Sequence, residues 1–197
     1  CMGNHELYTF TREQLAATLK MRRGYFRDAP QFYYSFRPAG SGLRFVVLDP
    51  YDRSTLNGVE EQTRDCIAWL RQHNPNDVTS YQVDWVAGLS GTNRRWLPYN
   101  GAVSDTQLEF LEQELLAARQ AQERVILLSH VSVCPGAQRS DETLLWNYDR
   151  VLTLLHQQPR GLVAACLYGH AHKGGYIQDA HGIHHRTFQA ILETTSN

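Results

Sequence analysis

The sequence lacks the features that define several protein classes. It has four cysteines, and no two of them form a Cys-x-x-Cys pair, which argues against a zinc ribbon or a disulfide framework and for a reducing compartment. No apolar run approaches the roughly 20 residues of a membrane-spanning helix, and no signal peptide is visible. The formal net charge of −1 gives no overall attraction to nucleic acid or membranes. We therefore expect a cytoplasmic protein with neither kind of partner, and its oligomeric state stays open.

The remaining composition is that of an ordinary globular protein. The chain has 197 residues, of which 42% are hydrophobic and 20% charged, enough for one domain with a sizeable core. Helical patterns alternate with short apolar runs, and hairpin patterns flank them. We expect one α/β domain over residues 1–197, a layered sandwich of helices and mixed sheets.

Capping boxes and the spacing of apolar residues locate the expected elements. Between residues 74 and 100 the pattern is irregular, and so long an irregular stretch in a compact domain is usually functional or mobile. Helices are expected from Thr11 to about Gly24, over 59–72, from Ser104 to about Gln122 and over 144–156. Strands are expected over 31–37, 43–48, 125–128, 162–168, 176–179 and 184–193.

Three short segments carry histidines that can bind a divalent metal or transfer a proton: Gly3-Asn4-His5-Glu6, Ser129-His130 and Gly169-His170-Ala171-His172. The last two follow apolar runs that predict buried strands, and strand ends of α/β scaffolds are where distant ligands meet. The amide oxygen of Asn4 together with imidazole nitrogens suits manganese, iron or zinc. A single histidine is more often an ordinary polar residue, and we apply that interpretation to the others: His73, His156, His181, His184 and His185.

His5 and three acidic residues, Glu6, Asp49 and Asp52, are interpreted separately. A histidine beside a metal-bound phosphate can donate a proton to the leaving oxygen, which is the role expected for His5. Glu6 either orients His5 or is an exposed charge at the start of a helix. Asp49 and Asp52 are expected to be loop acids rather than metal ligands.

In this order the three histidine segments resemble the motif series of calcineurin-like metallophosphoesterases. Further segments are similar to the manganese-dependent ADP-ribose/CDP-alcohol diphosphatases, and the similarity covers nearly the whole chain. These segments are Arg71-Gln72-His73-Asn74-Pro75-Asn76, Leu145-Trp146-Asn147-Tyr148, His172-Lys173-Gly174-Gly175-Tyr176 and Ile191-Leu192-Glu193-Thr194.

The resemblance implies an α-β-β-α sandwich that holds two divalent metals, with manganese favoured and iron or zinc as alternatives. A hydroxide activated by both metals would cleave the pyrophosphate bond of ADP-ribose and of CDP-alcohols such as CDP-choline. Asn4, His130 and His170 would bind one metal and His172 the other. His5 would assist departure of the leaving group.

Three aromatic residues are candidates for contact with a nucleotide base. Trp146, Tyr148 and Tyr176 could stack on the base, although aromatic residues on helices more often belong to the core. The sequence does not decide between these interpretations.

The sequence departs from the family at its beginning. The family's Asp-x-His or Asp-x-Gln and Gly-Asp-x-x-Asp segments precede Gly-Asn-His-Glu, and neither occurs in this chain. We therefore expect a fragment of a longer protein, without the first strands and helix of the sandwich and impaired in activity. Two alternatives stay open: another metallophosphoesterase, either a phosphomonoesterase or a cyclic-nucleotide phosphodiesterase, and a non-catalytic truncated form.

Overall fold

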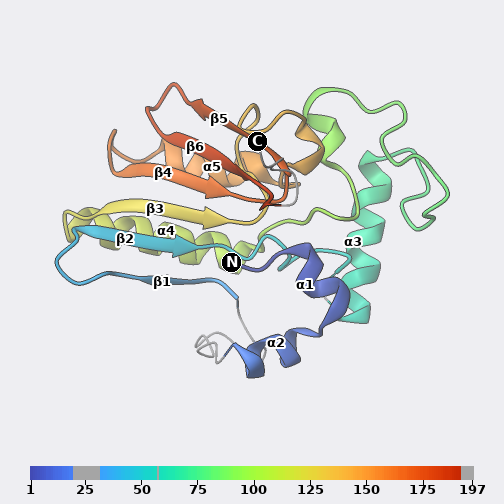
Figure 1. Cartoon of the computed structure of the whole chain (residues 1–197), viewed down its shortest axis with the longest axis horizontal. Coiled ribbons are helices and arrows are strands. Elements are labelled where there is room, and N and C mark those ends of the chain that lie inside the picture. The colour runs from blue at the N-terminus through green and yellow to red at the C-terminus, as the bar shows by residue number, and fades with distance from the viewer. Residues whose placement is uncertain (20–31, 57, 192–197) are drawn as a thin grey trace.

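A six-stranded mixed sheet forms the centre of the protein, as a computed structural model of residues 1–19, 32–56 and 58–191 shows (Figure 1). The strand order is β1-β2-β3-β4-β6-β5. The four inner strands run parallel: β2 (Leu43–Val47), β3 (Arg124–Ser129), β4 (Val163–Tyr168) and β6 (His184–Gln189). The edge strands β1 (Tyr34–Phe36) and β5 (Lys173–Gln178) are antiparallel to their neighbours. The α/β class and the mixed sheet are confirmed.

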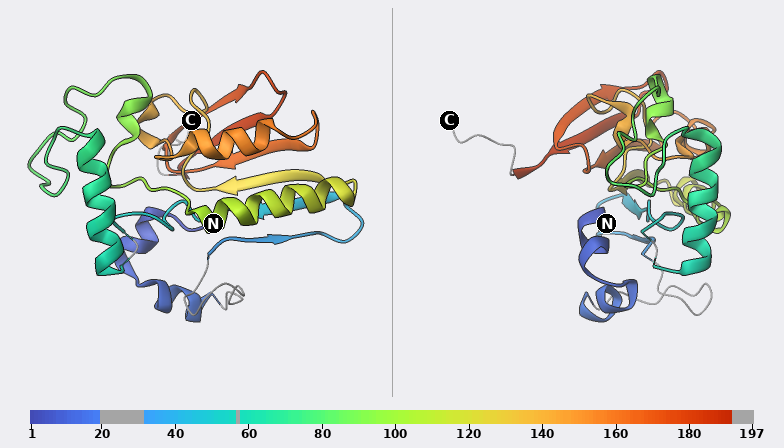
Figure 2. Two further views of the ribbon diagram at one scale, coloured as in Figure 1. Left: turned by 180° about the vertical axis from the view of Figure 1, so that it is seen from behind. Right: turned by 90° about the vertical axis from the view of Figure 1, so that its right-hand side faces the viewer.

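Two helices cover one face of this sheet. They are α4 (Asp105–Gln120) and α5 (Tyr148–His156), which lie behind the sheet in Figure 1 and in front of it in the left view of Figure 2. Leu111 and Leu115 of α4 are buried in the same core cluster as Val125 and Leu127 of β3. The hydroxyl of Ser104 accepts a hydrogen bond from the Gln107 N–H, the cap expected at this position.

The opposite face of the sheet is apolar but only partly covered. Phe45, Ile126, Leu128 and Leu167 are half-buried, whereas the residues that alternate with them are fully buried. In the parallel register Phe45 lies beside Ile126, and Leu128 lies beside Leu167. The sheet therefore presents a continuous apolar surface on the side away from α4 and α5.

The other helices lie at one end of the sheet (Figure 1). The expected capping box is present at Thr11 and Gln14, and the expected end of that helix near Gly24 lies outside the described residues. Across the residues that the structure describes, every helix is too short or too polar to cross a membrane. The elements in this part of the chain are α1 (Asn4–Thr9), α2 (Arg12–Thr18), α3 (Glu60–His73) and the short 3-10 helices η1 (Gly91–Arg95) and η2 (Asp141–Thr143).

The prediction of a helix over 144–156 is wrong in its first turn. Residues 144–146 pair their backbone with other segments: the Leu145 N–H donates to the Ser132 carbonyl, and the Trp146 N–H donates to the Gly101 carbonyl. Because these donors are engaged far along the chain, the helix begins only at Tyr148. Apolar residues at helical spacing do not distinguish this extended, buried segment from a helical turn.

Candidate metal centre

His130 follows β3 and is enclosed by the two other histidine segments. A Cβ atom placed on Gly3 would lie 3.0 Å from His130 Cε1, and one placed on Gly169 would lie 3.2 Å from His130 Nδ1. The Gly169 N–H also donates to the His130 carbonyl at 3.0 Å. Both glycines therefore leave space for the His130 ring, and Gly3 also leaves space for the Glu6 carboxylate, whose oxygen would lie 2.7 Å from a Cβ atom there.

Asn4 brings an amide oxygen to the same ring. It is buried at the start of α1, and its Oδ1 lies 3.2 Å from His130 Nε2. Glu6 accepts a hydrogen bond from the Gly3 N–H at 3.1 Å and so caps α1. Of the two interpretations of Glu6, an exposed charge at the start of a helix agrees with this contact.

His170 lies beside His130 because β3 and β4 are parallel neighbours whose register brings Ser129 opposite Tyr168. The centroids of the two imidazole rings are 5.1 Å apart. His170 has a φ of 62°, the left-handed backbone conformation that non-glycine residues rarely adopt. Its Nε2 lies 3.0 Å from the Oδ1 of Asn100, a residue 70 positions earlier in the chain.

His5 and His172 form the exposed side of the cluster. Their rings stack with a centroid separation of 6.3 Å and an interplanar angle of 29°. The structure thus brings together all five polar residues expected at the site, and we refer to Asn4, His5, His130, His170 and His172 as the strand-end group. Both histidine segments that follow strands contribute to it from the same edge of the sheet.

The two inner histidines are held uncharged. Burial lowers the pKa of His130 to about 4, and the neighbouring His5 and His172 act in the same direction. Burial also lowers the pKa of His170 to about 3, again with help from the surrounding histidines. Each imidazole therefore keeps a nitrogen lone pair at neutral pH, the state that binds a metal.

The donor atoms suit a borderline divalent cation. Bonds from such a cation to imidazole nitrogen and to oxygen are about 2.1 Å long, so two ligand atoms at right angles are about 3 Å apart. The separation of 3.2 Å between Asn4 Oδ1 and His130 Nε2 agrees with this geometry. Within the described ranges, no three His, Cys, Asp or Glu side chains are arranged to hold a metal. Asn4 Oδ1 and His130 Nε2 therefore have the spacing of two neighbouring ligand atoms, and the histidines alone do not form a complete set in the part of the chain that the structure describes.

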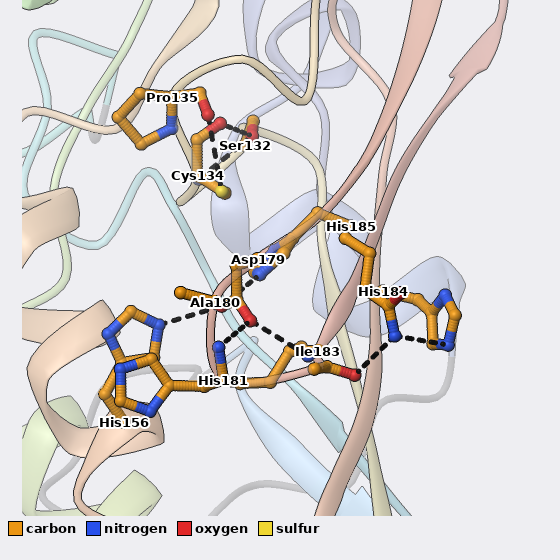
Figure 3. Close-up of polar contacts among 12 residues, drawn as sticks. Ser132, Cys134, Pro135, His156, Asp179, Ala180, His181, Ile183, His184 and His185 are labelled. Atoms are coloured by element: carbon orange, nitrogen blue, oxygen red, sulfur yellow. Dashed lines mark hydrogen bonds and ion pairs between the residues drawn. The ribbon is translucent and has the colours of Figure 1, made fainter.

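The remaining histidines of the second half of the chain gather around a different residue, Asp179 (Figure 3). The Asp179 Oδ2 lies 2.8 Å from His156 Nε2 and 3.1 Å from His185 Nε2. Its Oδ1 accepts hydrogen bonds from the His181 and Ile183 N–H groups, both at 2.9 Å. We call this set the Asp179 group; its members are Asp179, His156, His181, His185 and the adjacent His184, which contacts Tyr176 and Gln178 rather than the carboxylate. These contacts are the ones expected of ordinary polar residues.

Trp146 lies in the interior, where it cannot stack on a nucleotide. It is 1% exposed, belongs to a second core cluster with Trp96, and donates from Nε1 to the Leu97 carbonyl at 3.1 Å. Of the two interpretations of Trp146, core packing is the one that the structure supports.

The other two aromatic candidates are more accessible but engaged. The Arg95 guanidinium lies over the ring of Tyr148, 5.2 Å from its centroid. The hydroxyl of Tyr176 lies 2.8 Å from His184 Nδ1, which joins it to the Asp179 group rather than to the strand-end group.

The loop acids have structural partners. Asp49 is buried and forms an ion pair with Arg12 at 2.6 Å. Asp52 accepts hydrogen bonds from the Ser104 N–H and from Gln107 Nε2, both at 3.1 Å. Both carboxylates thus hold the segment after β2 against its neighbours, as expected of loop acids.

Sequence reasoning missed Asn100. The residue ends the irregular stretch 74–100 and precedes Gly101, and its contact with His170 depends on tertiary packing. The only signal in the sequence is its place at the end of a stretch already expected to be functional.

Comparison with known proteins agrees with this fold. No protein-family model matches the chain. Among solved structures, a dimetal phosphatase from Danio rerio matches 98% of this chain and 60% of its own, with a TM-score of 0.84 and 32% sequence identity. The chain therefore has the fold of a dimetal phosphatase.

The curated relatives share one enzyme name, which is more specific than the fold. Proteins named manganese-dependent ADP-ribose/CDP-alcohol diphosphatase match from Arabidopsis thaliana (40% identity over 194 residues, 98% of this chain and 58% of the relative) and from Homo sapiens (32% identity, 98% of this chain and 57% of the relative). The chain is a homologue of these diphosphatases, and it spans somewhat more than half of their length.

Proposed function

We propose that this chain supplies metal ligands to a manganese-dependent phosphoesterase that hydrolyses the pyrophosphate bond of ADP-ribose and of CDP-alcohols. The observation that carries the proposal is the meeting of Asn4 Oδ1 and His130 Nε2 at 3.2 Å, beside the ring of His170. The relatives' name supplies the metal and the substrates. We further propose that residues 1–197 belong to one domain of such an enzyme.

Each residue of the strand-end group has a distinct role in this proposal. Asn4, His130 and His170 hold one cation through an amide oxygen and neutral imidazoles, and His172 holds the second. His5 is exposed next to His172, so it can give a proton to the oxygen of the departing nucleotide product. When bound, manganese supplies water that ionises near neutral pH and offsets the charge on the phosphate oxygens.

Substrate contact falls to accessible groups around the cluster. Tyr99 packs its ring 5.7 Å from that of His170 and 6.3 Å from that of Trp85, which extends an aromatic surface outward from the strand-end group. Tyr148 and Tyr176 remain candidates for the base, with the partners described above.

The test is hydrolysis of ADP-ribose and CDP-choline with added Mn²⁺, beside a phosphomonoester and a cyclic nucleotide. The Arabidopsis thaliana relative and its matched segment of 194 residues serve as controls. We expect this chain to hydrolyse the diphosphates in preference to the other phosphoesters. If the matched segment of the relative is inactive as well, we expect this chain to bind Mn²⁺ and His130→Ala to abolish the binding. Preference for another phosphoester, an active matched segment beside an inactive chain, or no Mn²⁺ binding would each refute the proposal.

A further inference from the structure

Asn100 occupies a fixed position between the strand-end group and two short 3-10 helices. Its side chain is completely buried. The next residue, Gly101, approaches the backbone so closely that a Cβ atom there would lie 2.3 Å from the Pro50 carbonyl oxygen. The Asn100 N–H donates to the Leu97 carbonyl at 3.1 Å. The backbone therefore leaves the amide little freedom to move.

The orientation of the amide is fixed as well. Asn100 Nδ2 donates to the Arg95 carbonyl at 2.9 Å and to the Glu142 carbonyl at 2.7 Å. Exchanging the nitrogen and oxygen of the amide would place an oxygen against both carbonyls in a buried site, at a cost of about 1–3 kcal/mol for each unsatisfied group. The oxygen therefore faces His170.

An amide oxygen can only accept a hydrogen bond, so it selects the proton on its partner. Asn100 Oδ1 lies 3.0 Å from His170 Nε2, and this short contact requires a proton on Nε2. A neutral imidazole carries one proton, so its other nitrogen, Nδ1, keeps the lone pair.

We propose that Asn100 is a positioning residue that holds His170 in the tautomer with its proton on Nε2 and presents Nδ1 to the cation. The inference rests on the proposed function because that function makes His170 a metal ligand. Histidines that bind metals usually donate their second N–H to a protein oxygen, which sets the ring orientation and the tautomer. In this protein the accepting oxygen is that of the neutral Asn100 amide. The same amide donates to the carbonyls of Arg95 in η1 and Glu142 in η2, so it links both 3-10 helices to His170.

The decisive measurement is the tautomer of His170 in the metal-free wild-type chain. Long-range ¹H–¹⁵N correlation spectra distinguish a protonated ring nitrogen from an unprotonated one, and His170→Gln identifies the signal by its loss. We expect Nε2 to be protonated and Nδ1 to be unprotonated. A protonated Nδ1 with an unprotonated Nε2 would overturn the proposal without any substitution of Asn100.

A matched pair of variants separates positioning from stability. Asn74 is also buried, at 2% exposure, and its Nδ2 also donates to two backbone carbonyls, those of Trp85 at 2.9 Å and Trp96 at 2.8 Å. Its Oδ1 accepts from Asn76 rather than from a histidine. Asn74→Ala and Asn100→Ala therefore remove similar hydrogen bonds, and only the second frees His170.

We expect Asn100→Ala to give a mixture of His170 tautomers and to weaken Mn²⁺ binding by about 10–100-fold, the range typical of groups that orient a metal ligand. Asn74→Ala should leave both unchanged at a comparable loss of stability. Equal effects of the two variants, or a folded Asn100→Ala with the wild-type tautomer, would overturn the inference. If Asn100→Ala does not fold, the wild-type spectrum decides.

The outcomes also separate this inference from the proposed function. The expected tautomer in a chain that binds no Mn²⁺ would refute the metal assignment and leave the role of Asn100 in fixing the ring. Mn²⁺ binding and diphosphate hydrolysis with the opposite tautomer would support the function and refute the role of Asn100.

Discussion

The protein contains two clusters rich in histidine, and they differ in the groups that face the imidazole rings. In the Asp179 group one carboxylate oxygen contacts both His156 and His185, and it holds them in place. In the strand-end group the hydrogen-bond partners of His130 and His170 are the amide oxygens of Asn4 and Asn100. The number of histidines therefore does not distinguish the two clusters, but the groups that contact the ring nitrogens do.

The carboxylate does not decide the charge of the ring beside it. Asp179 favours the protonated form of His185, but burial is the larger effect and lowers the pKa of this imidazole. Buried amides give no such stabilisation, so burial keeps the pKa of His130 and of His170 low and both rings neutral. Each neutral ring keeps one nitrogen lone pair, and at His170 it lies on Nδ1, the nitrogen opposite the one that faces Asn100.

The largest difference between the clusters should appear in metal binding. His130→Ala removes an imidazole nitrogen that faces Asn4, and we expect Mn²⁺ affinity to fall more than about 100-fold, beyond the range of changes outside the ligand set. His156→Ala is the control, since it removes a histidine from the Asp179 group. Isothermal titration calorimetry would measure both, and an equal loss in the two variants would end the distinction.

The free energy of unfolding should depend more on the Asp179 group than on the strand-end group. In Asp179→Asn the carboxylate that accepts from the His181 and Ile183 N–H groups and contacts two histidines is replaced by a neutral amide. We expect the free energy of unfolding to fall by about 2 kcal/mol, with Mn²⁺ affinity unchanged. Urea unfolding gives the first quantity; a large loss of affinity at unchanged stability would show that the cluster serves the metal site.

Acid should destabilise the two clusters over different pH ranges. The pKa values of about 4 for His130 and about 3 for His170 lie below the ordinary value near 6.5. As the pH falls below about 6.5, the unfolded chain takes up protons that the folded chain does not, so the free energy of unfolding decreases, by about 2 kcal/mol for each of the two histidines down to pH 5. Burial lowers the pKa of His185 as well, so the Asp179 group also contributes to this range.

Below about pH 4 the stability depends on Asp179 and, down to about pH 3, on His170. Burial raises the pKa of its carboxyl group, but hydrogen bonds from the Ile183 N–H, His156 and His185 outweigh it and lower the pKa to about 2. Its stabilising contribution is therefore present above about pH 4 and is lost as the pH falls from about 4 to 2. Urea unfolding across pH should show a shallower decline above pH 4 when His130 and His170 are both replaced by Asn, and below pH 4 in Asp179→Asn. An exchange of these effects would contradict the assignment.

The smallest expected effects come from two glycines. Gly3→Ala places a methyl group 2.7 Å from the Glu6 carboxylate oxygen and 3.0 Å from His130 Cε1, at an ordinary φ of −109°. We expect Mn²⁺ affinity to fall about 3–10-fold, with a loss of about 0.5 kcal/mol of stability from the disturbed cap. Gly182 in the turn of the Asp179 group has open space but a φ of +83°, so alanine there should cost about 1 kcal/mol and leave affinity unaffected. Calorimetry and urea unfolding of both variants measure these opposite outcomes.

Much of the fold follows from local patterns in the sequence. The Thr11–Gln14 and Ser104–Gln107 caps begin helices where expected, because a cap satisfies backbone N–H groups that a helix leaves free. The apolar runs before His130 and Gly169 form adjacent parallel strands, which brings the two segments to one edge. Order along the chain therefore predicts which histidines meet.

The remainder depends on contacts between distant segments. The extended backbone of residues 144–146 and the burial of Trp146 both result from pairing with Gly101 and packing against Trp96. The role of Asn100 likewise depends on three partners that lie 5, 42 and 70 residues away. No local pattern of side chains encodes such contacts, so no reading of the sequence in short windows finds them.

The left-handed backbone of His170 has a consequence for which residues this position can hold. At a φ of 62° glycine is the least strained residue, and asparagine, aspartate and histidine adopt this conformation more often than other side chains do. A β-branched or bulky side chain would add strain where β4 leads into the strand-end group. Of the few residue types that the backbone tolerates here, histidine is the one that offers a nitrogen lone pair.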